Sequence, residues 1–387
     1  MKTSRLFHRL ITTVVCIIPI AALAQTDNVR HVAGRIPVAG FGRELSANRP
    51  AEANSQREIA TVNPKANPWK LQATLPGAII HDISFPTASV GYAAAELGQV
   101  WKTSNGGSTW TEIMNLGFPY YWYGVKALSA QKVVIAGFND SNFEGIIRWS
   151  HDGGKTWSPD IILTTNGWSF RVRFANHKDG LVLDGLNLKA ANAAHYTSDG
   201  GAQAADWTEI VPDPNGGWFG NQFSFLKNLH ARASGITYCD SSDAGQQWTC
   251  RPSIDSVFDG PVFFANDKTG WVGGGEIAPN VEGWVHRTTD GGNTWSGRTL
   301  DDPWPIREIR FVTPKIGWAA GGNYSTNVGG MYFSRNGGSS WSLDVSTGAE
   351  MDACDSRLVG TKFQVWCAGY NGSFSGVVYT LKNMAAE

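Results

Sequence analysis

The chain has 387 residues, with 45 glycines, 17 tryptophans and a formal net charge of −1 at pH 7. Glycine weakens helix interiors and aromatic residues favour sheets, so this composition indicates a β-rich fold and argues against a helical one. The 32 basic residues are balanced by 33 acidic ones without any basic run, which argues against nucleic-acid binding.

The first 24 residues predict a secretory signal peptide. Lys2, Arg5 and Arg9 precede an apolar stretch that leads to a small-residue cleavage pattern at Ala24. Cleavage near Ala24 leaves 29 basic residues against 33 acidic ones, a net charge of −4. We therefore expect a secreted or periplasmic protein, and no other stretch is long and apolar enough to span a membrane.

Residues 25–66 differ in composition from everything that follows them. They include several Arg, Asn, Pro and Ala residues, a single Phe and no Trp. A segment of this kind buries too little apolar surface to fold on its own. We expect a flexible leader or linker here, followed by one folded domain over residues 67–387.

Six nearly identical turns, each ending on a tryptophan, recur at intervals of roughly 40 to 50 residues. The copies span residues 103–110, 150–157, 197–207, 241–248, 288–295 and 334–341. A turn repeated at this period together with aromatic residues predicts a circular or stacked repeat architecture.

The residue types in the turn explain why it recurs. Its third position is occupied by Asn105, Asp152, Asp199, Asp243, Asp290 and Asn336. An Asp or Asn side chain there accepts hydrogen bonds from backbone N–H groups just ahead, and the glycines that follow tolerate positive φ. The turn resembles the Asp-box of the sialidase-like propellers, in which the box is structural and lies away from the catalytic face. We therefore assign these six residues to turns and not to catalysis.

Four short strand-like runs surround each box, which is the content of one propeller blade. A last unit, residues 351–383, has three such runs and no box, while residues 69–75 resemble an isolated fourth strand. Joining the two closes a ring without a free sheet edge. We therefore predict an all-β, seven-bladed β-propeller whose last blade is closed by an N-terminal strand. The alternative is six blades and a separate hairpin.

Four cysteines remain after removal of the leader, which contains Cys16. Cys239 and Cys250 flank the fourth box, and Cys354 and Cys367 stand on adjacent strands of the last unit. Of the three possible connectivities, only this local pairing needs no contact between blades. We predict two cross-strand disulfides. No CxxC motif or histidine pair stands at ligand spacing, so we expect neither a metal site nor a cofactor.

Residues 68–383 resemble the photosystem II stability and assembly factor family, most clearly in the run WKLQATLPGAIIHDISFPTASVGYAAAELGQVWKTSNGGSTWTEI. The resemblance implies a propeller that acts as a non-enzymatic assembly factor and binds protein partners through a charged face. No arginine patch can be matched residue by residue. The predicted disulfides depart from the family pattern and suit a protein outside the cytoplasm.

The segments before the predicted inner strands are unusually aromatic. Aromatic rings that stack on apolar sugar faces, beside convergent polar groups, are a common way to bind glycans. The candidate ligand-binding residues are Tyr121, Trp122, Trp168, Trp218 and Trp304. The alternative is that these aromatic residues fill gaps between blades.

Polar residues at the starts of the same strands are the candidates for catalysis, although they form no recognised motif. A glycosidase needs two facing carboxylates, and a polysaccharide lyase needs a proton acceptor and a cation. The candidates are His81, Asp82, Arg171, Arg307, Glu308 and Asp352.

Two functions therefore stay open. One is a secreted, non-enzymatic binding or assembly module for a glycan or for an extracellular or periplasmic protein. The other is a glycosidase or polysaccharide lyase that uses the same face. We expect a monomer, because a closed ring offers no strand edge for pairing.

Overall fold

The structure, a computed structural model, describes residues 69–165, 167–184, 194–210, 222–234, 237–252, 259–276, 282–300, 304–323, 326 and 328–385. All of these belong to the unit Val38–Glu387. The predicted signal peptide (1–24) and linker (25–66) lie outside the described residues. Within the described residues, no helix is long and apolar enough to cross a bilayer.

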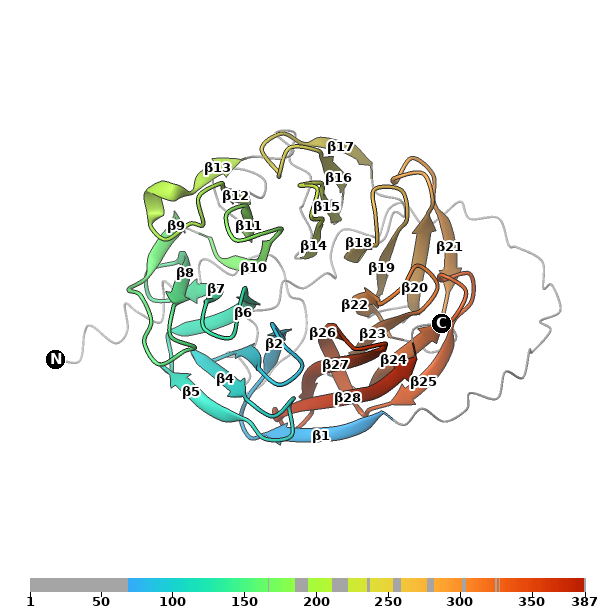
Figure 1. Ribbon diagram of the computed structural model, residues 1–387, viewed down its shortest axis with the longest axis horizontal. Helices are drawn as coiled ribbons and strands as arrows, with labels where there is room; N and C mark the ends of the chain where they lie inside the picture. Colours follow the sequence, from blue (N-terminus) through green and yellow to red (C-terminus); the bar gives the residue numbers. More distant parts are fainter. Residues whose placement is uncertain are drawn as a thin grey trace, which may run out of the picture. The chain divides into compact units, whose positions relative to one another are not determined.

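Seven antiparallel sheets of four strands each are arranged in a ring (Figure 1). From the inner to the outer strand, blade 1 comprises β2 (Ile80–Ser84), β3 (Gly91–Ala95), β4 (Gln99–Thr103) and β5 (Thr111–Asn115), and blade 2 comprises β6 (Tyr120–Ala127), β7 (Val133–Asn139), β8 (Glu144–Ser150) and β9 (Ile161–Thr165). Blade 3 comprises β10 (Ser169–Phe174), β11 (Gly180–Asp184), β12 (Ala194–Thr197) and β13 (Thr208–Ile210), and blade 4 comprises β14 (Gln222–Phe225), β15 (Ala231–Ser234), β16 (Thr237–Ser241) and β17 (Thr249–Pro252).

The remaining three blades follow the same order. Blade 5 comprises β18 (Asp259–Phe264), β19 (Gly270–Glu276), β20 (Glu282–Thr288) and β21 (Ser296–Thr299), and blade 6 comprises β22 (Ile306–Phe311), β23 (Gly317–Asn323), β24 (Val328–Ser334) and β25 (Ser342–Ser346). Blade 7 comprises β26 (Ala349–Val359), β27 (Lys362–Asn371), β28 (Gly376–Ala385) and β1 (Lys70–Leu75). The one short helix, among the residues described, is η3 (Ala204–Asp206).

The ring is closed by pairing the two ends of the propeller. β1 runs antiparallel to β28, with Lys70 opposite Thr380 and Leu75 opposite Gly376. The predicted seven-bladed propeller and its closure by an N-terminal strand are therefore confirmed.

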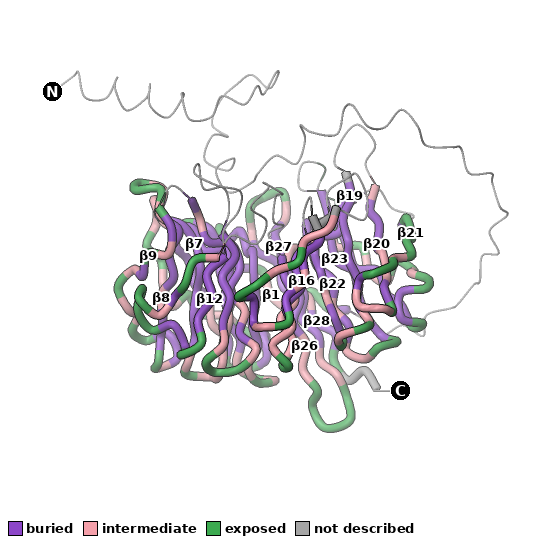
Figure 2. The backbone as a smooth tube through the Cα atoms, turned by 90° about the horizontal axis from the view of Figure 1, so that it is seen from above, coloured by how far each residue is buried: buried purple, intermediate pink, exposed green. Residues whose placement is uncertain are grey.

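Because successive strands alternate in direction, the turns fall on two faces of the ring. We call one the box face: it carries the six repeated turns, called box turns below, and the turns between the first and second strands of each blade. The other, the loop face, carries the turns between second and third strands and the links from each outer strand to the next inner strand. Figure 2 shows buried strands between these two edges of exposed turns.

The hydrophobic core lies between neighbouring blades. Trp122 of blade 2, for example, packs in one cluster with Tyr92 of blade 1. Trp271 of blade 5 stacks on Phe311 of blade 6 with ring centroids 3.5 Å apart. Each such aromatic side chain, fully buried, contributes about 2–3 kcal/mol to stability, so the core itself holds the blades in a ring.

Two disulfides join neighbouring strands within single blades. Cys239 on β16 is bonded to Cys250 on β17, and Cys354 on β26 is bonded to Cys367 on β27. Both pairs stand directly opposite each other in the strand register. The two predicted pairings are confirmed.

Candidate functional site

A β-bulge recurs near the loop-face end of five inner strands, which surround the axis of the ring (Figure 1); we call the region around this axis the channel. In five inner strands the register skips one residue: His81, Tyr123, Phe170, Arg307 and Asp352. A bulge bends the strand and re-aims the side chain of the extra residue. The six candidate catalytic residues all lie at or next to these bulges, near the loop face.

Asp82 joins a polar network that links three blades. Its carboxylate lies 2.8 Å from Arg173 and 3.7 Å from Arg171, both on β10. The same carboxylate accepts the backbone N–H groups of Ile83 and Val125, each at 3.0 Å. Asp82 therefore joins blades 1, 2 and 3, and its oxygens are already engaged.

Arg171 is likewise fixed by neighbours on other blades. Its Nη1 donates hydrogen bonds to the carbonyl oxygens of His81 at 2.5 Å and Tyr123 at 2.7 Å. The amide oxygen of Gln222 on β14, in its hydrogen-bonded orientation, accepts from Arg171 at 2.9 Å. The guanidinium is thereby held against the channel wall.

His81 is buried between two carboxylates. Its Nε2 lies 3.1 Å from Glu96 and its Nδ1 lies 3.5 Å from Asp352 on blade 7. Burial by itself would lower the pKa of His81, but the hydrogen bonds to Asp352 and Glu96 outweigh it and raise the pKa above its ordinary value. The imidazolium form is favoured by both partners.

Glu308 differs from the other candidates. Among the described residues, no cation lies close enough to its carboxylate to form an ion pair. Burial raises its pKa to about 7, although Arg173, Arg171 and Arg310 act to lower it. Near neutral pH this carboxyl is therefore divided between its protonated and ionised forms.

Further ionic residues in the channel could not be singled out from sequence. Asp355 pairs with Arg310 at 2.6 Å and accepts the backbone N–H of Phe85 at 2.7 Å, which ties blades 6, 7 and 1 together. Burial lowers the pKa of Lys126 to about 8, with Asp355 opposing the shift. Lys126, Arg173, Arg310 and Asp355 each stand three residues after the residue skipped at a bulge, and the sequence does not mark those bulges.

Three of the five aromatic residues predicted to bind a ligand have buried side chains in the structure. Tyr121, Trp122 and Trp304 are buried, and Trp122 has no exposed surface. Trp168 is half-buried, with its ring 5.4 Å from Phe138 and 5.9 Å from Phe170. Trp122 and Trp304 belong to core clusters that each span two blades. Trp218 lies outside the described residues.

The repeated turns form the hydrogen-bond pattern expected from their residue types. In blade 2, Asp152 Oδ1 accepts the N–H groups of Lys155 and Thr156, each at 2.9 Å, while Ser150 Oγ accepts that of Gly154 at 2.7 Å. Asn105, Asp243, Asp290 and Asn336 accept backbone N–H groups in the same way. In the third turn, Asp199 Oδ1 accepts the N–H of Gly201 at 3.2 Å.

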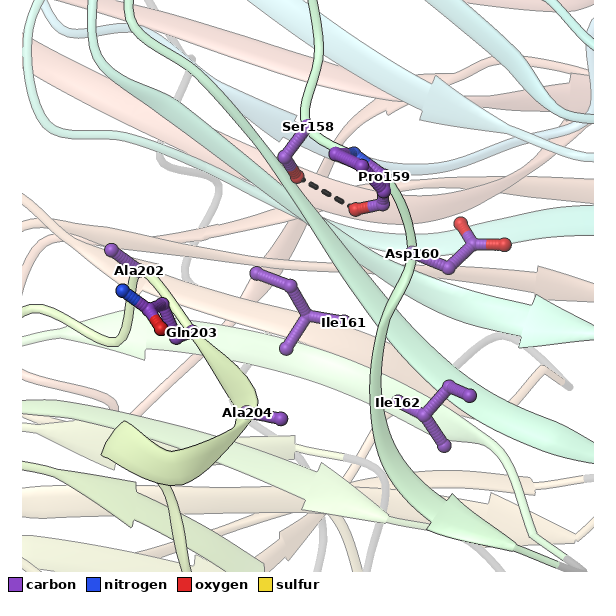
Figure 3. Close-up of a pocket in the computed structure, with 8 residues that line it drawn as sticks. All are labelled: Ser158, Pro159, Asp160, Ile161, Ile162, Ala202, Gln203 and Ala204. Atoms are coloured by element: carbon purple, nitrogen blue, oxygen red, sulfur yellow. Dashed lines mark hydrogen bonds between the residues drawn. The ribbon is translucent and has the colours of Figure 1, made fainter.

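An open pocket of about 390 Å³ lies at the outer strand of blade 2, and none of the candidate residues lines it (Figure 3). It is formed by β9 and the residues before it, and by the insertion in the third turn that contains η3. Ile161, Ile162 and Ala204 line it, while the carboxylate of Asp160 pairs with Arg148 at 2.6 Å. The described residues contain no cluster of three or more His, Cys, Asp or Glu side chains suited to a metal ion.

No protein-family model and no curated protein matches the sequence. Among solved structures, the chain is similar to "YCF48 bound to D1 peptide", with a TM-score of 0.60 and 19% identity over 82% of this chain and 97% of that one. It is also similar to YCF48 from Cyanidioschyzon merolae, with a TM-score of 0.59 and 19% identity over 81% and 98% of the two chains. The WD40 β-propeller domain of Doa1 has a TM-score of 0.56 and 12% identity over 81% and 96%. These likenesses confirm the fold that the family resemblance implied.

Proposed function

We infer that the chain is a non-enzymatic binding or assembly module that holds a protein partner on the loop face of the propeller. The observation that carries this proposal is the engagement of the candidate catalytic side chains by neighbouring blades. Asp82 pairs with Arg173, His81 lies between Glu96 and Asp352, and Arg307 lies 3.3 Å from Glu350. Groups committed to holding the ring together are poorly placed to turn over a substrate.

The likeness to YCF48 adds support, because that propeller has been observed with a bound peptide. We further propose that this chain acts outside the cytoplasm after cleavage near Ala24, as a monomer. The two disulfides favour such a compartment, since cytosolic thiols are kept reduced.

A glycosidase or lyase at the same face is the second candidate. One feature favours it: Glu308 has a pKa of about 7, as a general acid requires, and Asp82 contributes to that shift.

Arrays of peptides and of neutral and acidic glycans, probed with the full chain, distinguish these functions when bound material is also analysed for cleavage. Peptide binding without cleavage supports the proposal, and Glu308→Gln should leave that binding unchanged. Glycan cleavage that Glu308→Gln abolishes would overturn it in favour of the enzyme. Retention of glycans alone, without cleavage, would also overturn the assignment to a protein partner.

A further inference from the structure

Three consecutive blades carry a large apolar residue in the left-handed backbone region at the same turn of the loop face. Phe374 in blade 7, Leu97 in blade 1 and Phe143 in blade 2 have φ values of 54°, 55° and 56°. Their exposed fractions are 39%, 37% and 40%. Bulky residues rarely adopt this conformation, and strain that recurs at exposed positions is a feature of functional surfaces.

The neighbouring link between blades 1 and 2 extends this apolar surface. Leu116 and Phe118 are 38% and 61% exposed. The backbone N–H of Leu116 donates to Gly98 at 3.3 Å, and that of Gly117 donates to Leu97 at 2.9 Å, so the link lies against the turn of blade 1. We call Leu97, Leu116, Phe118 and Phe143 the apolar rim.

A backbone hydrogen bond also joins this link to the turn of blade 2, because the N–H of Asp140 donates to the carbonyl oxygen of Pro119 at 2.9 Å. On its other side the same turn accepts, at Phe143, the N–H of Gly167 in the link between blades 2 and 3, at 3.3 Å. The apolar rim is therefore one continuous surface built from adjoining segments of two blades.

The charge around the apolar rim has one sign. The loop-face segments of blades 7, 1 and 2 contain no Lys or Arg in residues 75–80, 96–98, 116–119, 139–144 and 371–375. Asp140 and Glu144 border the rim, and both are half-buried. Burial raises the pKa of Asp140, and no cation of the described chain offsets that effect. A carboxylate in this setting is complementary to a cation brought by a partner.

We propose that the apolar rim, with Asp140 and Glu144, docks a basic polypeptide segment in which Lys or Arg residues are interspersed with large apolar side chains. This inference rests on the proposed binding function and names its site and partner chemistry. An anionic lipid surface would be repelled by the two carboxylates. A second copy of the chain would bring the same acidic rim and would be repelled in the same way.

The test uses a fluorescein-labelled peptide that alternates Lys with Leu and Phe, and two counterparts in which Glu replaces Lys or Ser replaces Leu and Phe. Fluorescence anisotropy with the full chain should show binding of the first peptide alone, weakened by added salt. Phe118→Ser and Asp140→Lys should each weaken it by about tenfold or more. Leu358→Ser is the matched control, because Leu358 is 59% exposed on the hairpin of the box face.

Each contrary outcome has a defined meaning. If the arrays yield bound peptides whose affinity is unchanged by both rim variants, binding occurs elsewhere, so this inference fails while the proposed function stands. If no peptide of any composition binds, both fail. If the Glu peptide binds as tightly as the Lys peptide, the rim does not select a basic segment and has another occupant. If the Lys peptide binds only after deletion of residues 25–66, that segment is the occupant. A dimer that Asp140→Lys dissociates would assign it to a second copy.

Discussion

Trp366 of blade 7 donates its indole N–H to the carbonyl oxygen of Gly106, in the box turn of blade 1, at 2.9 Å. Phe85 of blade 1 stacks on the same indole with ring centroids 3.8 Å apart. Indole N–H groups also bond to box-turn glycines of the next blade in two further pairs: Trp149 to Gly201 and Trp271 to Gly337. In these three pairs the box turn therefore connects one blade to the next, and one of the pairs lies at the closure of the ring.

Replacing Trp366 by Phe should lower the free energy of unfolding by about 1–3 kcal/mol, because it removes both the hydrogen bond to Gly106 and buried volume. Urea unfolding followed by tryptophan fluorescence measures this. The control is Trp157→Phe, since the indole N–H of Trp157 is buried without an acceptor in the part of the chain that is described. Equal losses in the two variants would show that the bond between blades adds nothing.

Glu308 should make the propeller less stable as the solution becomes neutral. Its pKa is raised from 4.5 to about 7 in the folded chain. The folded state therefore binds its proton more tightly than the unfolded state does, and stability falls between these two pH values. Glu308→Gln should remove this fall and stabilise the protein above pH 7 by up to about 3 kcal/mol.

The control for Glu308 is Glu350→Gln, which removes the buried partner of Arg307 and should destabilise the protein at the same pH. Unfolding free energies measured across the pH range compare the two variants. A loss of stability in Glu308→Gln above pH 7 would mean that Glu308 is ionised and usefully paired.

The ring could be predicted from sequence because its determinants are local. Five of the six box turns are made by residues within eight positions of one another, the third being longer by an insertion, and the period of the turns counts the blades. The strand that completes blade 7 was recognised because residues 69–75 had no partner of their own in the repeat. The disulfides followed from the hairpin that places Cys239 opposite Cys250.

The sequence could indicate where on the strands the candidate site residues lie, but not which of them contact one another. Asp82 and Arg173 are 91 residues apart in sequence and meet only because the ring turns blade 1 towards blade 3. Trp122 was a candidate ligand-binding residue, with packing between blades as the alternative. The register shift beside it leaves its ring in a cluster with Tyr92 of blade 1 and re-aims the neighbouring Tyr123. A single bulge reverses which side chain faces the channel, and no local signal in the sequence marks it.

The box turns should differ in their response to acid. The pKa of Asp290 is lowered from 3.8 to about 2 by hydrogen bonds from the Thr294 side chain and backbone, and that of Asp152 is lowered by the same contacts with Thr156. Their stabilising bonds are therefore present above about pH 4 and are lost as pH falls through the lowered pKa values. Asn105 accepts the N–H of Thr109 at 2.9 Å without titrating.

Hydrogen exchange measured between neutral pH and about pH 2 should thus show the turns of blades 2 and 5 opening at acid pH while those of blades 1 and 6 stay closed. The turns of blades 1 and 6, which contain Asn105 and Asn336, are the internal controls. Asp152→Asn should make the turn of blade 2 behave like these controls. Uniform opening of all turns would indicate global unfolding in place of local titration.

Leu97→Asn should stabilise the propeller and weaken partner binding in the same molecule. Leu97 has a φ of 55°, a conformation that Asn tolerates better than Leu, so relief of strain should raise the free energy of unfolding by about 1 kcal/mol. Leu116→Asn is the matched control, because Leu116 lies beside it in the apolar rim and does not have a positive φ. Peptide anisotropy should show that both variants lose affinity. Thermal unfolding should show that only Leu97→Asn gains stability. A gain in stability with unchanged affinity would mean that the strained turn does not serve the docking surface.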